Sequence, residues 1–199
     1  PNSTFSDTFY LWDEPLAYGK DYAWAGNSWL AYSATRWIAQ VEAMRELGVR
    51  VATPSVRYET PEQVRDQFKE FFDACQPSCV TLDDPSYVDI LALRVFCDPD
   101  EEFCDKKVEE VTGVLTDLSA SFDSRPVHIT GWGVLTNNGA SKLQEAMKAT
   151  DGFFENGSPI DRVYWWGGNG TDSTNLDLPT GKEQNQFLAD VWVDICKNY

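Results

Sequence analysis

The longest apolar run in the chain is YVDILALRVF, at residues 87–96. A near-continuous apolar run of this length predicts a strand that is buried on both faces, as in a parallel sheet. Helix-like segments flank it. Residues 60–75 begin with Thr-Pro-Glu-Gln, a helix-start signal, and residues 102–118 carry apolar side chains at helical spacing. The stretch therefore predicts a strand between two helices, which is the repeating unit of an α/β fold.

The alternation of strand and helix continues along the chain. We expect further strands at residues 8–12, 49–52, 127–130 and 161–166, and further helices at residues 33–47, 141–150 and 184–196. The apolar positions expected to face the core of the first three helices are Trp37, Val41, Met44 and Leu47; Val64, Phe68, Phe71 or Phe72, and Cys75; and Val108, Val111, Leu115 and Leu118. This order predicts a single α/β domain over residues 1–199, with its functional site where the strands end.

The composition is strongly acidic, with 32 Asp and Glu against 16 Lys and Arg and a net charge of −16. Such a charge repels phosphate backbones and anionic lipids, so we expect no nucleic-acid partner. No apolar stretch reaches membrane-spanning length, and we expect no membrane insertion. A neutral polymer fits better, because the 8 Trp, 8 Tyr and 11 Phe include flat rings on which sugars stack.

The five cysteines favour disulfides over a metal site. Spacings of four and seven residues fit local bonds Cys75–Cys79 and Cys97–Cys104, although spacing alone does not prove connectivity. Cys196 is then left over. With one His in the chain and two tight CxxC pairs absent, we expect no metal and no cofactor.

Three sequons, at Asn2, Asn156 and Asn169, mark candidate glycosylation sites, the second weakened by Pro159. Together with the cysteines they predict a secreted glycoprotein, located outside the cell, in the cell wall or at the cell surface. Because the chain begins at Pro1, we expect that a leader, or more, has been removed.

Glu14 is the candidate general acid. It lies in Trp12-Asp13-Glu14-Pro15, at the end of an expected strand. Flanking by Trp12 and Pro15 would partly desolvate the carboxyl, which raises its pKa and retains the proton that it must donate. The alternative is a solvated loop glutamate that caps a helix.

Five segments in a fixed order carry a family resemblance. They are WDEP at residues 12–15, VATPS at 51–55, VDILALRVF at 88–96, PVHITGW at 126–132 and RVYWWG at 162–167. This series resembles glycoside hydrolase family 128, the alkali-sensitive-linkage type of glycosyl hydrolase catalytic domain, from about Tyr10 to the C-terminus. The resemblance implies a (β/α) barrel of glycosidase type that acts outside the cell on β-1,3-glucan.

The resemblance also implies roles for single residues. Glu14 matches the acid/base of the family's Asn-Glu-Pro motif, and Trp165 matches the aromatic floor under the sugar at the cleavage point. Gly131 falls on the nucleophile of its Thr-Glu-aromatic motif. Because hydrolysis of this kind needs two carboxyl groups, the glycine predicts loss of the reaction.

Other positions depart from the family. Asp13 replaces the Asn that contacts the sugar, and Arg94 and Phe96 replace the usual His and Tyr. The candidate substrate-binding residues are Trp12, Asp13, Arg94, Phe96, Trp132 and Trp165. An Arg94–Glu14 pair would lower the pKa of Glu14, which is unsuitable for an acid.

We find no convincing substitute nucleophile. Asp89 lies five residues before Arg94, so strand alternation turns it to the opposite face. His128 is the only histidine, so we predict a packed or hydrogen-bonded side chain instead of Ser-His or Cys-His chemistry.

The number of expected strands also differs from that of the family. The family's Asn-Glu-Pro strand is the fourth of eight, whereas here it is the first of five. We expect a C-terminal portion of the full barrel that lacks the first strands, because five strands leave such a barrel open. The missing strands are reduced, lie on another polypeptide, or are replaced by another subunit, to which Cys196 could bond.

Three functions follow as hypotheses. The preferred one is a secreted, catalytically inactive protein that binds β-glucan or forms a structural part of an extracellular assembly. The alternative is an active endo-β-1,3-glucanase that uses Glu14 with a displaced nucleophile. The third is a plain secreted domain without sugar affinity.

Overall fold

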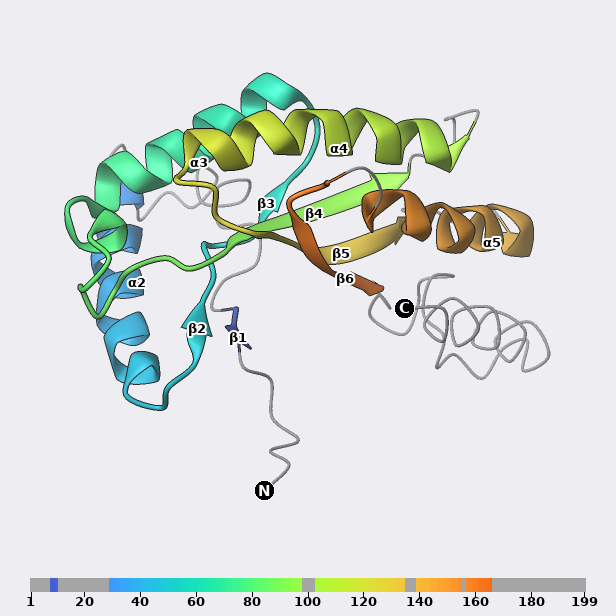
Figure 1. The fold of residues 1–199 in the computed structure, drawn as a ribbon. Coiled ribbons are helices and arrows are strands. Elements are labelled where there is room, and N and C mark those ends of the chain that lie inside the picture. Colours follow the sequence, from blue (N-terminus) through green and yellow to red (C-terminus); the bar gives the residue numbers. More distant parts are fainter. Residues whose placement is uncertain (1–7, 11–28, 98–102, 135–138, 155–156, 166–199) are drawn as a thin grey trace. The chain divides into compact units, whose positions relative to one another are not determined.

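The computed structural model describes residues 8–10, 29–97, 103–134, 139–154 and 157–165 (Figure 1). In chain order its elements are β1 (Thr8–Phe9), α2 (Trp29–Arg45), β2 (Arg50–Val51), β3 (Val56–Arg57), α3 (Pro61–Cys75), η3 (Ser78–Val80), β4 (Leu91–Cys97), α4 (Cys104–Ser121), β5 (Val127–Val134), α5 (Gly139–Ala149), η4 (Thr150–Phe154) and β6 (Ile160–Trp165). The predicted alternation of strands and helices is confirmed over these ranges.

The strands and the helices that connect them form an α/β fold. The four-stranded sheet has the order β3-β4-β5-β6, and β1 pairs with β2 in parallel, with Thr8 opposite Arg50. A parallel bridge joins Ala52 to Ile90. Helix α4 connects β4 to β5 and α5 connects β5 to β6, which is the crossover that parallel strands require. The expected α/β class is therefore confirmed, and the arrangement is that of a partial (β/α) barrel.

The chain divides into two compact units. Unit 1 contains residues 1–93 with Arg125–Val127, and unit 2 contains residues 94–124 and 128–199. In unit 1, α2 packs against α3 (Figure 1), where Trp37 meets Phe71 edge-on with ring centroids 5.0 Å apart. In unit 2, α4 packs against α5 and η4. The single domain over residues 1–199 stays a prediction.

Helix α3 follows its local signals. The Thr60 side chain accepts a hydrogen bond of 3.2 Å from the backbone N–H of Gln63, and Pro61 occupies the first turn. Its buried residues include both of the phenylalanines between which the sequence left a choice. In α4 all four predicted core residues are buried. Amphipathic spacing was therefore sufficient to assign both inner faces.

The ends of other elements differ from the prediction. Helix α2 runs from Trp29 to Arg45, four residues ahead of the expected start. Leu47 lies past its last turn and is 72% exposed, so its expected place in the core is wrong. Strand β3 was not predicted. Strand β4 begins at Leu91, because the residues before it bond to side chains and loop carbonyls.

Strand β5 is twice as long as expected. It extends to Val134, so Gly131 and Trp132 lie inside the strand and not after it. The expected helix at residues 184–196 and the last two residues of the strand expected at residues 8–12 fall outside the described residues. Of the helices that the structure describes, none is long and apolar enough to cross a membrane.

Candidate functional site

Strand β4 carries the first part of the candidate site. All seven of its residues are buried. Near its start, Ala92 clusters with Ala52 and Ile90, and Tyr10 packs against them. Because side chains alternate along a strand, Arg94 and Phe96 follow Ala92 on the same face. One side of the strand therefore carries, in order, an apolar patch, a cation and an aromatic ring.

Arg94 and Phe96 contact each other. The guanidinium carbon of Arg94 lies 5.3 Å from the centroid of the Phe96 ring, a distance at which a cation is attracted to an aromatic face. Only 8% of Arg94 and 5% of Phe96 is exposed. A planar guanidinium held in this way supplies hydrogen-bond donors in fixed directions. Such donors suit hydroxyl or carboxylate oxygens.

Trp132 lies on the helix-covered face of unit 2. Its ring is fully buried and meets Phe153 edge-on, with centroids 5.1 Å apart. Its indole N–H donates a hydrogen bond of 2.8 Å to the carbonyl of Ala146 in α5. The Trp132 ring is therefore enclosed by the protein core, and its expected role in substrate binding stays a prediction.

Gly131 lies on the opposite face of β5 from Trp132. As the neighbour of Trp132 inside β5, it belongs to the face turned away from α5 and η4. It is buried and provides no side-chain functional group. The position assigned to the nucleophile thus lies on the sheet face away from these two elements, without a carboxylate.

His128 and Asp161 form a pair that the sequence showed only in part. His128 is fully buried, and its Nε2 lies 3.1 Å from Oδ2 of Asp161 in β6. The predicted packed and hydrogen-bonded His128 is confirmed. Asp161 was missed as its partner, because nothing local links two strands 33 residues apart.

Strand alternation places this pair on the face of Trp132, since His128 precedes Trp132 by four residues. Asp161 therefore does not replace the missing nucleophile on the face of Gly131. By the same alternation Trp165 shares the face of Asp161 in β6. Its role as a sugar platform stays a prediction.

Both predicted disulfides are confirmed. Cys75 and Cys79 are bonded, with Cα atoms 5.7 Å apart, and Cys97 and Cys104 are bonded at 5.4 Å. The second bond ties the last residue of β4, next to Phe96, to the first residue of α4. It thereby fixes where the chain leaves the strand that carries the candidate site.

Asp89 has a structural role. Its Oδ2 accepts hydrogen bonds from the backbone N–H of Val51 at 2.7 Å and from Nη1 of Arg45 at 2.8 Å. Trp12, Asp13 and Glu14 lie outside the described residues, as do the sequons at Asn2, Asn156 and Asn169 and the cysteine at Cys196. No three metal-ligating side chains of the described ranges gather to hold an ion.

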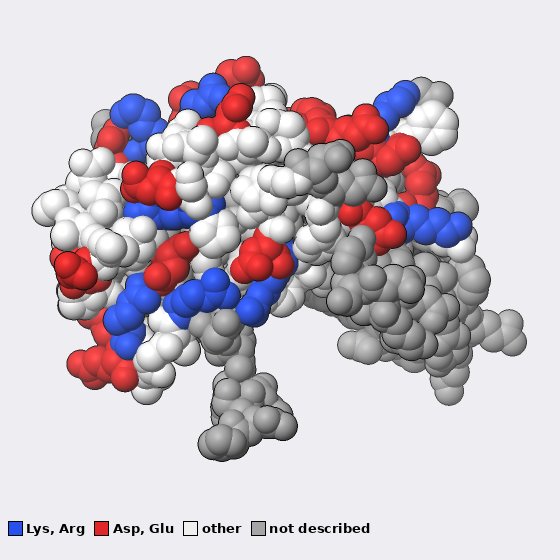
Figure 2. All heavy atoms as spheres, in the orientation of Figure 1, with Lys and Arg blue, Asp and Glu red and all other residues white. Residues whose placement is uncertain are grey.

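Acidic and basic side chains are interspersed over the described part of the face drawn in Figure 2. On this face the acidic side chains therefore do not form one continuous block.

Solved structures similar to this chain are enzymes of glycoside hydrolase family 128. One is a subgroup II endo-β-1,3-glucanase from Sorangium cellulosum, with a TM-score of 0.58 and 17% identity over 82% of this chain and 62% of that one. Another is a subgroup VI exo-β-1,3-glucanase from Aureobasidium namibiae, with a TM-score of 0.57 and 15% identity over 89% and 61%.

A third is a curdlan-specific subgroup III exo-β-1,3-glucanase from Blastomyces gilchristii, solved with glucose, with a TM-score of 0.53 and 15% identity over 77% of this chain and 59% of that one. Identities this low establish the fold alone. The chain spans about six tenths of the length of each enzyme.

A comparison with curated protein sequences found no significant match. The glycosyl hydrolase catalytic core family, in contrast, matches residues 27–190, which is most of the chain. That match agrees with the family 128 resemblance of the five ordered segments and with the fold of the solved glucanases. The chain therefore belongs to the glycosyl hydrolase catalytic core family.

Proposed function

We propose that the chain is a secreted glycosyl-hydrolase-like protein that binds β-1,3-glucan and lacks the two-carboxylate hydrolysis of its relatives. The observation that carries the proposal is Gly131, a buried glycine inside β5 at the position that the family resemblance assigns to the nucleophile. In a retaining glycosidase the two carboxyl groups stand about 5–5.5 Å apart across the sugar. Because glycine has no carboxyl side chain, one member of that pair is missing.

Two described carboxylates, one in β6 and one just before β4, bind other groups of the protein. Asp161 binds His128 on the opposite face of the sheet, and Asp89 binds Val51 and Arg45. These contacts, together with the glycine at position 131, support the proposed loss of hydrolysis.

Binding is supported by the β4 face. Arg94 and Phe96 form a pre-arranged pair of donor fork and aromatic ring, and binding surfaces use both. The two disulfides support an oxidising, extracellular location. Within an extracellular assembly, Cys196 would be the residue available for a bond to another subunit.

The test is a paired measurement on laminarin, a soluble β-1,3-glucan. We expect the wild-type protein to bind it, by titration calorimetry, without releasing reducing ends. Arg94→Met should weaken binding at least about tenfold, because it removes a charge-assisted donor worth about 1.5–3 kcal/mol. A matched control is Arg36→Met, which removes an exposed arginine of α2.

The second candidate is an active endo-β-1,3-glucanase with a displaced nucleophile, and the retained Glu14 favours it. In that case laminarin hydrolysis would be present and lost in Glu14→Gln but not in Glu59→Gln, an exposed carboxylate elsewhere. A 2-fluoro glucoside would then label the displaced carboxylate, which peptide mass analysis would locate. Either result contradicts the binding-only proposal.

A further inference from the structure

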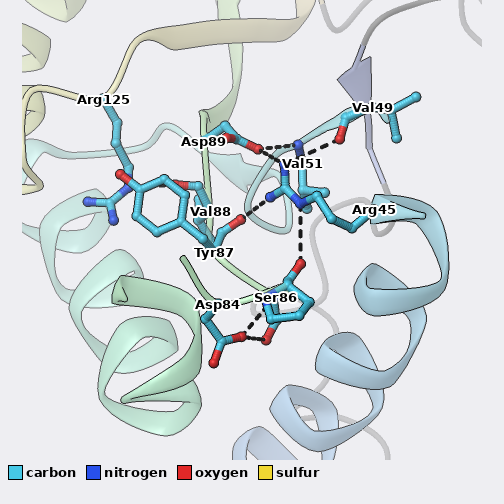
Figure 3. Close-up of polar contacts among 10 residues, drawn as sticks. Arg45, Val49, Val51, Asp84, Ser86, Tyr87, Val88, Asp89 and Arg125 are labelled. Atoms are coloured by element: carbon cyan, nitrogen blue, oxygen red, sulfur yellow. Dashed lines mark hydrogen bonds and ion pairs between the residues drawn. The ribbon is translucent and has the colours of Figure 1, made fainter. Parts of the chain in front are cut away.

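Residues 87–89, which Ile90 separates from the start of β4 at Leu91, form a segment that we term the anchor. Its backbone polar groups bond to side chains and loop carbonyls as well as to a neighbouring strand (Figure 3). Because buried backbone groups must be paired, whatever pairs them decides where the strand begins. The anchor is fixed from three directions, all within unit 1.

The first direction is α2. Its last residue, Arg45, donates to the carbonyl of Tyr87 and to Oδ2 of Asp89, the latter at 2.8 Å. Two further bonds, to the carbonyls of Pro85 at 3.2 Å and Val49 at 3.3 Å, hold the guanidinium in place. Every nitrogen of this guanidinium thus has an acceptor, and two of these acceptors belong to the anchor (Figure 3).

The second direction is the segment that leads into β5. Nε of Arg125 donates to the carbonyl of Val88 at 2.7 Å. Its guanidinium carbon lies 4.7 Å from the centroid of the Tyr87 ring and 5.3 Å from that of Phe72. Arg125 is only 3% exposed, so these contacts form where water does not compete.

The third direction comes from the loop after α3 and from β2. The N–H of Val88 donates to the carbonyl of Cys79 at 3.1 Å, and Cys79 is bonded to Cys75. The N–H of Asp89 donates to the carbonyl of Val51 at 2.8 Å, and the N–H of Val51 returns a bond of 2.7 Å to the Asp89 carboxylate. The third group of contacts to the anchor therefore comes from a disulfide-closed loop and from strand β2.

We infer that Arg45 and Arg125 are positioning residues for the candidate glucan site. They hold successive carbonyls of the anchor and so fix the register of β4. A slip of one residue would turn Arg94 and Phe96 to the opposite face of the sheet. The inference rests on the proposed function for its ligand, but the amide protection of β4 can be measured without any ligand.

The experiment follows hydrogen exchange of the full chain in Arg45→Met and Arg125→Met. We expect amide protection in Leu91–Cys97 to fall at least about fivefold while α3 keeps most of its protection, because the lost bonds are local to the anchor. Lys69→Met is the matched control, since it removes a basic group of the same unit whose ion pair with Asp73 is exposed.

Unchanged protection of β4 in both variants, or an equal loss in α3 and β4, would overturn the inference. Arg45→Lys serves as a second variant that keeps the charge but not the planar fork. If the melting temperature of this variant stays within about 3 °C of wild type, its laminarin affinity should still fall severalfold. An unchanged affinity would contradict the positioning role. A wild-type protein that fails to bind laminarin refutes the proposed function, and hydrogen exchange still decides the anchor.

Discussion

The indole N–H of Trp132 donates a hydrogen bond of 2.8 Å to the carbonyl of Ala146. This contact fixes which face of β5 meets α5, and it therefore turns Gly131 to the other face. The two adjacent residues therefore differ in role. Trp132 is a core residue, whereas Gly131 is a candidate catalytic position on the other face.

Trp132→Phe should destabilise the fold without changing glucan affinity. The ring contact with Phe153 is largely kept, while the indole donor is lost. The carbonyl of Ala146 retains a bond of 3.3 Å from Thr150, so we expect a cost of about 1–2 kcal/mol in the free energy of unfolding. Urea denaturation and laminarin titration measure the two effects. Lost binding at full stability would show that Trp132 contacts the ligand.

Gly131→Glu should restore slow release of reducing ends from laminarin. The new carboxyl would supply the nucleophile that the family resemblance predicts at this position, and Glu14 is the acid that the same resemblance predicts. Gly131→Gln is the matched control, because it has the same size without a nucleophilic oxygen anion. Activity in both variants, or activity that persists when Glu14→Gln is added, would contradict the assignment of these two positions.

Gly152→Ala should destabilise unit 2. A Cβ atom there would lie 2.9 Å from Cγ1 of Val108, so α4 and η4 would have to move apart. We expect a loss of about 1–3 kcal/mol in the free energy of unfolding. Gly113→Ala in α4 is the matched control, since nothing lies within 4 Å of its Cβ, and it should stabilise the helix by about 0.5–1 kcal/mol. Equal effects of the two changes would contradict the close approach.

Ser86→Ala should lower stability in a pH-dependent way. The hydroxyl and the N–H of Ser86 both donate to Oδ1 of Asp84, at 2.6 and 2.9 Å, and these bonds lower the pKa of Asp84 below its usual 3.8. A carboxyl with a lowered pKa stabilises the fold above about pH 4 and loses this effect as the pH falls through its folded pKa. Unfolding midpoints of both proteins should therefore differ at pH 6 and converge toward pH 2–3. A difference that grows in acid would contradict this sign.

Removal of the Cys97–Cys104 bond by a double change to serine should cost about 2 kcal/mol, the value for closing so short a loop. Both sulfurs belong to fully buried residues, so a mild reductant without denaturant should leave the bond intact. Thiol titration of the native and the unfolded protein separates the two states. Rapid native reduction would show that the bond is accessible.

Several features could be predicted because their signals are local. The Thr60 cap and the spacing of Val64 and Phe68 lie within a few turns of one helix, where periodicity reports burial directly. The two disulfides span four and seven residues, so proximity in sequence favoured the pairing that the structure confirms. The order of strands and helices followed from the same short-range patterns.

The sequence by itself thus determined the α/β class, the inner faces of α3 and α4 and the family, and it favoured the two local disulfides. The tertiary structure decided where β4 and β5 begin and end, that Trp132 is buried, and that His128 meets Asp161. Those outcomes depend on bonds between distant residues, such as Arg45 with Tyr87 and Arg125 with Val88. No local pattern encodes which distant donor reaches a given carbonyl, because that choice is made only when the elements pack.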